Sequence, residues 1–133
     1  MGLPSTGDHH NNQIAIGIDS KIYFGQGEAT NSGVVGEDNV RLGWIKTAPQ
    51  FHDIPANNIT LTGQNFVTVN SLTAESNDTT TTGAFVPFGT PTKEGQIIKG
   101  DIKCNVVLSA NMDGTDLTLV GWGFRSAYGI TFF

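Results

Sequence analysis

The chain has 133 residues and a net charge of −5, with 12 acidic residues against 7 basic ones. Charged residues make up only 14% of it, well below the roughly 25% of typical soluble domains, and Gly, Thr and Asn take their place. Because these three residue types favour strands and turns, the composition excludes a mainly helical protein. The acidic balance also argues against nucleic acid as a partner, since affinity for a phosphate backbone comes from Lys and Arg.

The first residues show neither the basic stretch nor the apolar core of a secretory signal. No apolar run approaches the roughly 20 residues that cross a bilayer. We therefore expect synthesis in a cytoplasm and no contact with a membrane. Cys104 is the only cysteine, which excludes an intrachain disulfide, and its apolar neighbours predict a small buried strand residue.

Residues 1–12 are mostly polar and predict an extended arm ahead of a single domain over residues 13–133. Polar arms of this kind are normally disordered unless something ties them down. We expect a neighbouring subunit to hold the arm. The predicted contact residues are Leu3, Pro4, His9 and His10.

Regular structure is expected to begin at residues 13–18, where three isoleucines alternate on one face. Residues 21–24 return as the second strand of a hairpin. Residues 25–36 contain four glycines and predict a loop. This loop lacks the lysine and the following helix of a phosphate-binding loop, so we expect no nucleotide cofactor there.

In the middle of the chain, Val40, Leu42 and Trp44 alternate, which predicts a strand over residues 40–46. Proline cannot donate to a strand ladder, so the two prolines that follow indicate an irregular linker. The further expected elements are the linker over 50–54, strands over 58–62 and 66–72, a polar loop over 74–83 and an edge strand over 84–88.

The last third of the chain shows the clearest strand pattern. Residues 96–101 lead into a predicted strand over residues 102–108. Asp113 and Gly114 then precede a strand over 116–122, and Asp-Gly between alternating runs predicts a hairpin because its turn needs positive φ. Residues 128–133 predict a terminal strand. The eight or nine short strands indicate an all-β, antiparallel sandwich or barrel, jelly-roll-like, with essentially no helix.

The titratable residues form no catalytic or metal-binding pattern. A zinc site needs three or four converging ligands, whereas the histidine features are one pair in the arm and His52 beside Asp53. Asn111, Asp113 and Asp116 resemble part of a calcium loop, but the Gly and Glu positions of that loop do not fit, and a turn explains the same residues. We predict no metal, no cofactor, no catalytic residue and no enzyme activity.

The aromatic residues allow two interpretations. Trp44, Trp122, Tyr23 and Tyr128 have the chemistry of a sugar-stacking platform, which would make the protein a carbohydrate-binding module or adhesin. However, both tryptophans lie in alternating runs next to glycines that make room for large rings or bulges. We therefore expect Trp44 and Trp122 in the core.

The chain ends on Phe132 and Phe133 without a polar tail, so we expect these rings to be buried in the core or against a partner, with Phe133 a predicted contact residue. With the arm, the single domain and the apolar end over 130–133, the chain resembles virion structural proteins of tailed bacteriophages, in particular head decoration (cement) proteins. The end segment is also similar to the closing strand of trimeric jelly rolls of the tumour-necrosis-factor type.

The resemblance implies a homotrimer that binds the major capsid protein on the outside of a phage head and stabilises the shell. Its location would then be the virion, after synthesis in the host cytoplasm. Other virion parts remain as alternatives, namely a tail-tube, neck or fibre subunit, beside the carbohydrate-binding module.

Overall fold

The computed structural model describes residue 3 and residues 6–9, 11–75, 77–102 and 104–133. The protein is nearly all β, which confirms the predicted class and the number of strands. Its elements are β1 (Asn11–Ile16), β2 (Ile22–Gln26), α1 (Glu37–Arg41), α2 (Trp44–Thr47), β3 (Ile59–Thr62), β4 (Asn65–Val69), β5 (Thr79–Gly83), β6 (Glu94–Ile98), β7 (Val106–Ala110) and β8 (Thr118–Trp122).

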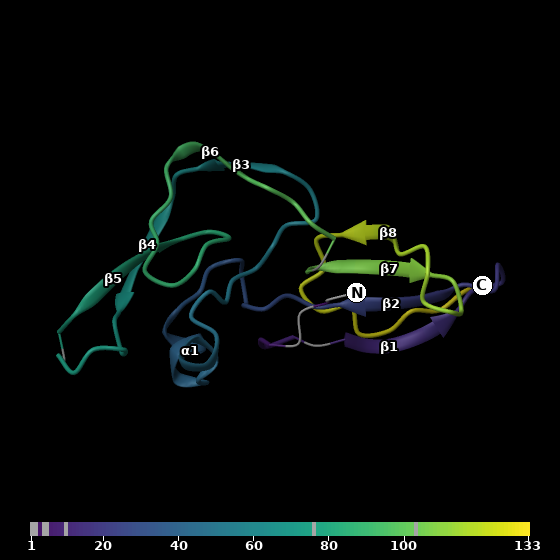
Figure 1. Ribbon diagram of the computed structural model, residues 1–133, viewed down its shortest axis with the longest axis horizontal. Helices are drawn as coiled ribbons and strands as arrows, with labels where there is room; N and C mark the ends of the chain where they lie inside the picture. The colour runs from purple at the N-terminus through teal and green to yellow at the C-terminus, as the bar shows by residue number, and fades with distance from the viewer. Residues whose placement is uncertain (1–2, 4–5, 10, 76, 103) are drawn as a thin grey trace.

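The strands form three antiparallel sheets. One has four strands in the order β1-β2-β7-β8, and the other two are ribbons of two strands, β3-β6 and β4-β5. Figure 1 shows the four-stranded sheet at one end of an elongated molecule, with the ribbons and helices at the other end. The C-terminus lies at the sheet end.

The four-stranded sheet consists of two hairpins. The sequence predicts the turns of both. In the first, the Gly17 N–H donates to the Lys21 carbonyl at 2.9 Å, and Ser20 has a φ of 61°. In the second, Gly114 has a φ of 82° and the Asn111 N–H donates to the Thr115 carbonyl at 2.9 Å, which confirms the Asp-Gly turn. Strands β2 and β7 then pair in the middle of the sheet.

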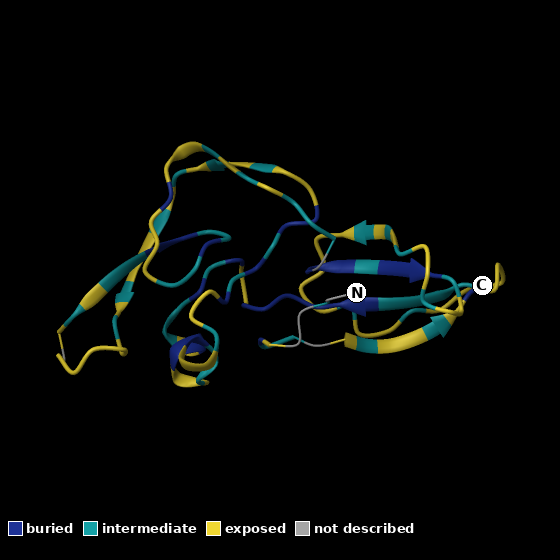
Figure 2. Ribbon diagram, in the orientation of Figure 1, coloured by how far each residue is buried: buried dark blue, intermediate teal, exposed yellow. Residues whose placement is uncertain are grey.

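Most of the buried apolar residues that the structure describes form two small clusters. The cluster under the four-stranded sheet consists of buried Ala56, Val106 and Leu108, with Leu3, Phe24, Ile102, Leu117 and Leu119 packed against it. The cluster around the helices consists of buried Ala29, Val35, Val40, Ile45 and Phe51, with Trp44, Ala48 and Phe88 against it. In Figure 2 the buried residues gather on β7 and on the segments that lead to the helices, whereas the ribbons are mostly half-buried or exposed.

The predicted strand over residues 40–46 is wrong, because this segment belongs to two short helices. Val40 and Trp44 are four residues apart, so the pattern that alternates along a strand also places them on one side of a helix. Both side chains contact the same core cluster. Gly43, with a φ of 86°, lies between α1 and α2 and separates them.

Two other local predictions are also wrong. Residues 79–83, expected in a polar loop, form β5, because β-branched threonine suits a pleated strand that has a partner. Residues 84–88 form no strand, since Phe85 has a φ of 57° and its N–H donates to the Gly33 carbonyl at 2.7 Å. Residues 128–133 form no strand either.

The C-terminal segment, residues 123–133, crosses the four-stranded sheet instead. A Cβ placed on Gly25 would lie 2.6 Å from the Ala127 carbonyl oxygen, so the glycine leaves room for this segment. The Asn12 amide donates to that same oxygen at 3.1 Å. Near the end of the segment, the Phe132 ring packs edge-on against Tyr23 with centroids 4.9 Å apart. The segment thus covers part of the sheet without joining its ladder.

Candidate assembly surfaces

The structure places the predicted contact residues in different surroundings. Pro4 and His10 lie outside the described residues. Leu3 packs against the cluster of the chain's own sheet, and the His9 N–H donates to the Glu28 carbonyl at 3.2 Å. Phe133 is fully exposed, so its ring is not buried within one copy. Of these residues, Phe133 has the surroundings that a contact with a partner needs.

A buried carboxylate joins the linker after the helices to the chain after β2. Asp53 has no exposed surface and accepts hydrogen bonds from the Ala29 N–H at 2.5 Å and the Thr30 N–H at 3.1 Å. The Thr30 hydroxyl donates to the same carboxylate at 2.5 Å. A buried charge is tolerated when hydrogen bonds replace water, so Asp53 has a structural role here.

Glu28 lies at a junction of four segments. Its N–H donates to the Arg125 carbonyl at 3.2 Å, and its own carbonyl accepts from His9, so both terminal segments bind to it. Only 6% of Glu28 is exposed. Burial raises the pKa of the Glu28 carboxyl to about 7, with a further increase from Asp53 and an opposing effect of Arg125. The junction therefore contains a group that titrates near neutral pH.

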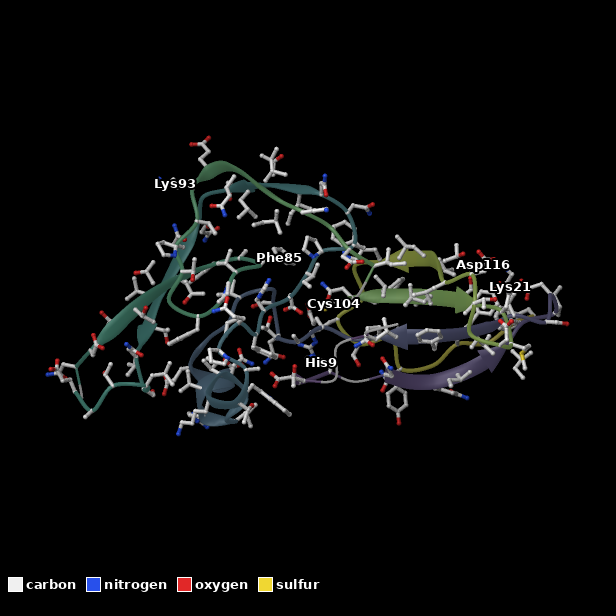
Figure 3. All side chains as sticks on the ribbon, viewed as in Figure 1. His9, Lys21, Phe85, Lys93, Cys104 and Asp116 are labelled. Atoms are coloured by element: carbon white, nitrogen blue, oxygen red, sulfur yellow. The ribbon has the colours of Figure 1, made fainter. Side chains whose placement is uncertain are left out.

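The thiol of Cys104 is shielded from solvent. Burial raises the pKa of the Cys104 thiol to about 11, so the nucleophilic thiolate does not form at neutral pH. Figure 3 shows Cys104 at the start of β7, between the sheet and the ribbon end. Within the described ranges, no group of three or more His, Cys, Asp or Glu residues is placed to hold a metal ion.

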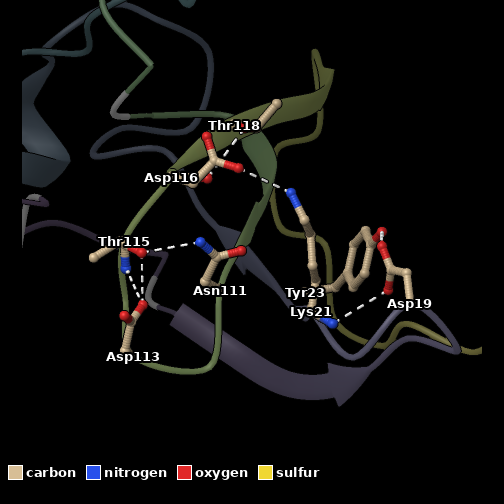
Figure 4. Close-up of polar contacts among 8 residues, drawn as sticks. All are labelled: Asp19, Lys21, Tyr23, Asn111, Asp113, Thr115, Asp116 and Thr118. Carbon is tan, nitrogen blue, oxygen red and sulfur yellow. Dashed lines mark hydrogen bonds and ion pairs between the residues drawn. The ribbon is translucent and has the colours of Figure 1, made fainter.

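The acidic residues of the β7–β8 turn are held by hydrogen bonds and an ion pair (Figure 4). The Asp113 carboxylate accepts from both the N–H and the hydroxyl of Thr115, at 2.9 and 2.6 Å. Asp116 forms an ion pair with Lys21 at 3.0 Å, which ties this turn to the β1–β2 turn. These contacts confirm that the three acceptor-rich residues of the sequence build a turn.

The surface of the described residues contains two hollows of note. One, of about 180 Å³, is lined by Ser32, Val34, Leu61, Thr62, Gly63, Gln64, Phe66, Ala84 and Thr92, and it is smaller than a typical small-molecule site of roughly 300–1,000 Å³. The other, of about 530 Å³, is lined by His52, Ile54, Lys99, Gly100 and Asp101. Small-molecule sites are mostly apolar, whereas the lining of this second hollow is largely polar, so it does not resemble such a site.

Exposed apolar side chains are the most prominent surface feature. Ile14, Ile16 and Ile18 are 62%, 63% and 97% exposed. They lie on β1 and in the turn after it, at one edge of the four-stranded sheet. We call residues 11–18 the β1 edge. Its sequence contains no charged residue and no proline.

A second apolar surface lies on the β4–β5 ribbon. Val67 and Val69 are 70% and 43% exposed, and their partners across the ribbon are Thr81 and Thr79. We call these four side chains the Val/Thr face. On the opposite face of the ribbon, Thr82 is buried and its hydroxyl accepts the Gly89 N–H at 2.8 Å. Thr82 is thus covered by the chain itself, whereas Val67 and Val69 are open to solvent.

The tryptophans fulfil the core prediction only in part. Trp44 packs against the helix cluster, but Trp122 on β8 is 37% exposed, so its predicted burial is wrong. The physical reason is that β8 is an edge strand, whose side chains have neighbours on one side only. Tyr128 is 81% exposed. The ring contact found among the described residues joins Tyr23 to Phe132 and brings neither tryptophan into a row.

No family model, curated protein or solved structure matches this chain. In the part of the chain that the structure describes, no helix has the length and apolar character to cross a membrane. The interpretation of the exposed surfaces therefore depends on their geometry.

Proposed function

We propose that the protein is a structural subunit that acts as a homo-oligomer and decorates the outside of a phage head, where it stabilises the shell. The observation that carries the proposal is unburied apolar surface. The accessible surface is 7727 Å², against about 6,700 Å² expected for a compact monomer of this mass. Sixteen large apolar side chains of the described residues are exposed. A surface of this kind supports an interaction role over a free monomer.

The mechanism is burial of this surface between repeated copies. The Val/Thr face and Phe133 would contact capsid subunits, and each contact would be modest. Symmetry repeats such a contact many times, so that the decorated shell becomes stable although one contact is weak. The sheet end and the ribbon end lie at opposite ends of an elongated molecule, which lets one copy reach two neighbours (Figure 1).

Co-sedimentation with the heads of the phage that encodes the chain tests this function. We expect the protein to pellet with heads, and Val67→Lys to weaken binding about tenfold, because a charge must be desolvated in the contact. Ser71→Lys is the matched control, since Ser71 is exposed in the loop after β4. The proposal is contradicted if the unaltered protein does not bind heads. It is also contradicted if Val67→Lys binds them as well as Ser71→Lys does.

Exposure of Trp122 and Tyr128 favours carbohydrate binding as a second candidate function. Aromatic rings that are exposed to solvent are available to stack on sugars. Titration with glycans would then quench tryptophan fluorescence, and Trp122→Ala would remove the change. An unchanged spectrum across a glycan panel rejects this candidate.

Other virion roles, such as that of a tail-tube or neck subunit, predict that the protein forms rings with more copies than a dimer or trimer.

A further inference from the structure

The four-stranded sheet has two edges that differ in their protection. On β8 the register shifts between Val107 and Leu108, so that the edge carries a bulge. On β1 the shift lies between Asn11 and Ile14, and residues 14–16 stay in regular register with β2. Natural proteins protect sheet edges with bulges, prolines and charged side chains. The regular part of the β1 edge has none of these.

The main-chain groups of the β1 edge point in a defined direction. Gly17 bonds to Lys21 across the hairpin, so the pair beyond Ile16 is a hydrogen-bonded one. In an antiparallel ladder such pairs alternate with pairs whose N–H and C=O groups point away from the partner. Ile14 and Ile16 therefore direct their main-chain groups outward. No strand of the described chain lies beyond β1 to accept them.

The sequence at this edge is complementary to itself. In an antiparallel pair centred on Ala15, Ile14 lies opposite Ile16 of the partner subunit, and the outward main-chain groups of both residues meet. Ala15 then lies opposite its equivalent at the closest type of pair, about 4.5 Å between Cα atoms, where a small side chain fits. The chain's net charge of −5 is carried elsewhere, so no like charges face each other in this contact.

We propose that two copies of this chain pair antiparallel through their β1 edges and form one eight-stranded sheet, β8-β7-β2-β1-β1-β2-β7-β8. The four isoleucines at positions 14 and 16 then lie together on one face. Both side chains are more than 60% exposed in one copy, so the pairing removes apolar surface from water. This inference does not depend on binding to a phage head.

Disulfide crosslinking tests the pairing in the full chain. Ala15→Cys places two thiols opposite each other at the centre of the contact, within the Cα distance that a disulfide tolerates. Gln13→Cys is the matched control, because its two copies lie four residues out of register. With a mild oxidant we expect Ala15→Cys to form covalent dimers at least about tenfold faster than Gln13→Cys. Equal rates overturn the proposal.

Sedimentation of charged variants supplies the second arm. Ile16→Lys places a charge in the pair and is expected to raise the dissociation constant of the dimer more than about tenfold. Ile97→Lys adds the same charge on β6, outside the four-stranded sheet, where the side chain is 67% exposed, and leaves the dimer intact. A mass of three chains agrees with the trimer implied by the resemblance and overturns this pairing. Failure of head binding alone leaves the β1 pair standing.

Discussion

The four-stranded sheet and the two ribbons consist of strands of similar length, yet they differ in what they bury. Val106 and Leu108 of β7 are fully buried, because β7 has a strand on each side and a cluster beneath it. Val67 and Val69 of β4 stay exposed, since a ribbon of two strands has no interior position. An isolated pair of strands is marginally stable in water. The ribbons therefore depend on the helices, on the loops and, in our account, on neighbouring copies.

The largest expected effect tests this difference directly. Leu108→Ala removes a fully buried side chain from the sheet and is expected to lower the free energy of unfolding by about 2–5 kcal/mol. Val67→Ala on the open ribbon face is expected to cost less than about 0.5 kcal/mol, since it leaves no cavity. Urea unfolding of both variants measures this. Equal costs would contradict the division between a self-sufficient sheet and a dependent ribbon.

The pH dependence of stability sharpens the comparison at the junction between the two ends. The ordinary pKa of a glutamate is 4.5, and in the folded protein that of Glu28 is about 7. Protonation is thus favoured by folding, and the stabilisation is complete below pH 4.5 and lost as the pH rises through 7. We expect the wild type to be less stable at pH 8 than at pH 5, by about 1–2 kcal/mol after screening by solvent is taken into account.

Glu28→Gln keeps the shape of the side chain and removes its titration, so its stability is expected to be nearly constant between pH 5 and pH 8. Urea unfolding at both pH values compares it with the wild type. The pKa values of Asp19 and Asp113 are lowered below 3.8 by hydrogen bonds, so these groups do not titrate in this window. A wild type that is equally stable at both pH values would show that Glu28 is not shielded from water.

Part of the fold follows from the sequence and part does not. The isoleucines of residues 13–18 and the Asp-Gly turn gave correct hairpins, because both signals are local. The Thr run of β5 looked like a loop, since only the pairing with β4 makes it a strand. The spacing of Val40 and Trp44 fits both the two-residue period of a strand and the 3.6-residue period of a helix. Their burial against a cluster of residues distant in sequence favours the helix.

The candidate surfaces were less accessible to sequence reasoning. Exposure of Phe133 agrees with the predicted contact role, whereas Leu3, a predicted partner contact, lies against the chain's own core. Burial of Glu28 and Asp53 gave no local signal, because it results from the meeting of four separate segments. The uncharged run of residues 11–18 was the one available sign of an unprotected edge.

The smallest expected effect concerns two turns, one at the sheet end of the molecule and one at the ribbon end. Ser20, in the β1–β2 turn, has a φ of 61°, a conformation that glycine adopts without strain. Ser20→Gly is therefore expected to raise the melting temperature by about 2 °C, which corresponds to about 0.5 kcal/mol. Ser71→Gly, in the loop of the β4–β5 ribbon, relieves no such strain and is expected to lower it slightly. Equal shifts in thermal melts would contradict a strained turn at Ser20.

The most direct test of the account is the mass of the protein in solution, measured by light scattering over a concentration series. We expect about 28 kDa for the wild type, twice the 14.1 kDa of one chain. The mass is expected to fall toward that of one chain on dilution and for Ile16→Lys. A mass of 14.1 kDa for the wild type at every concentration would contradict the claim that its exposed apolar edges are covered by a second copy.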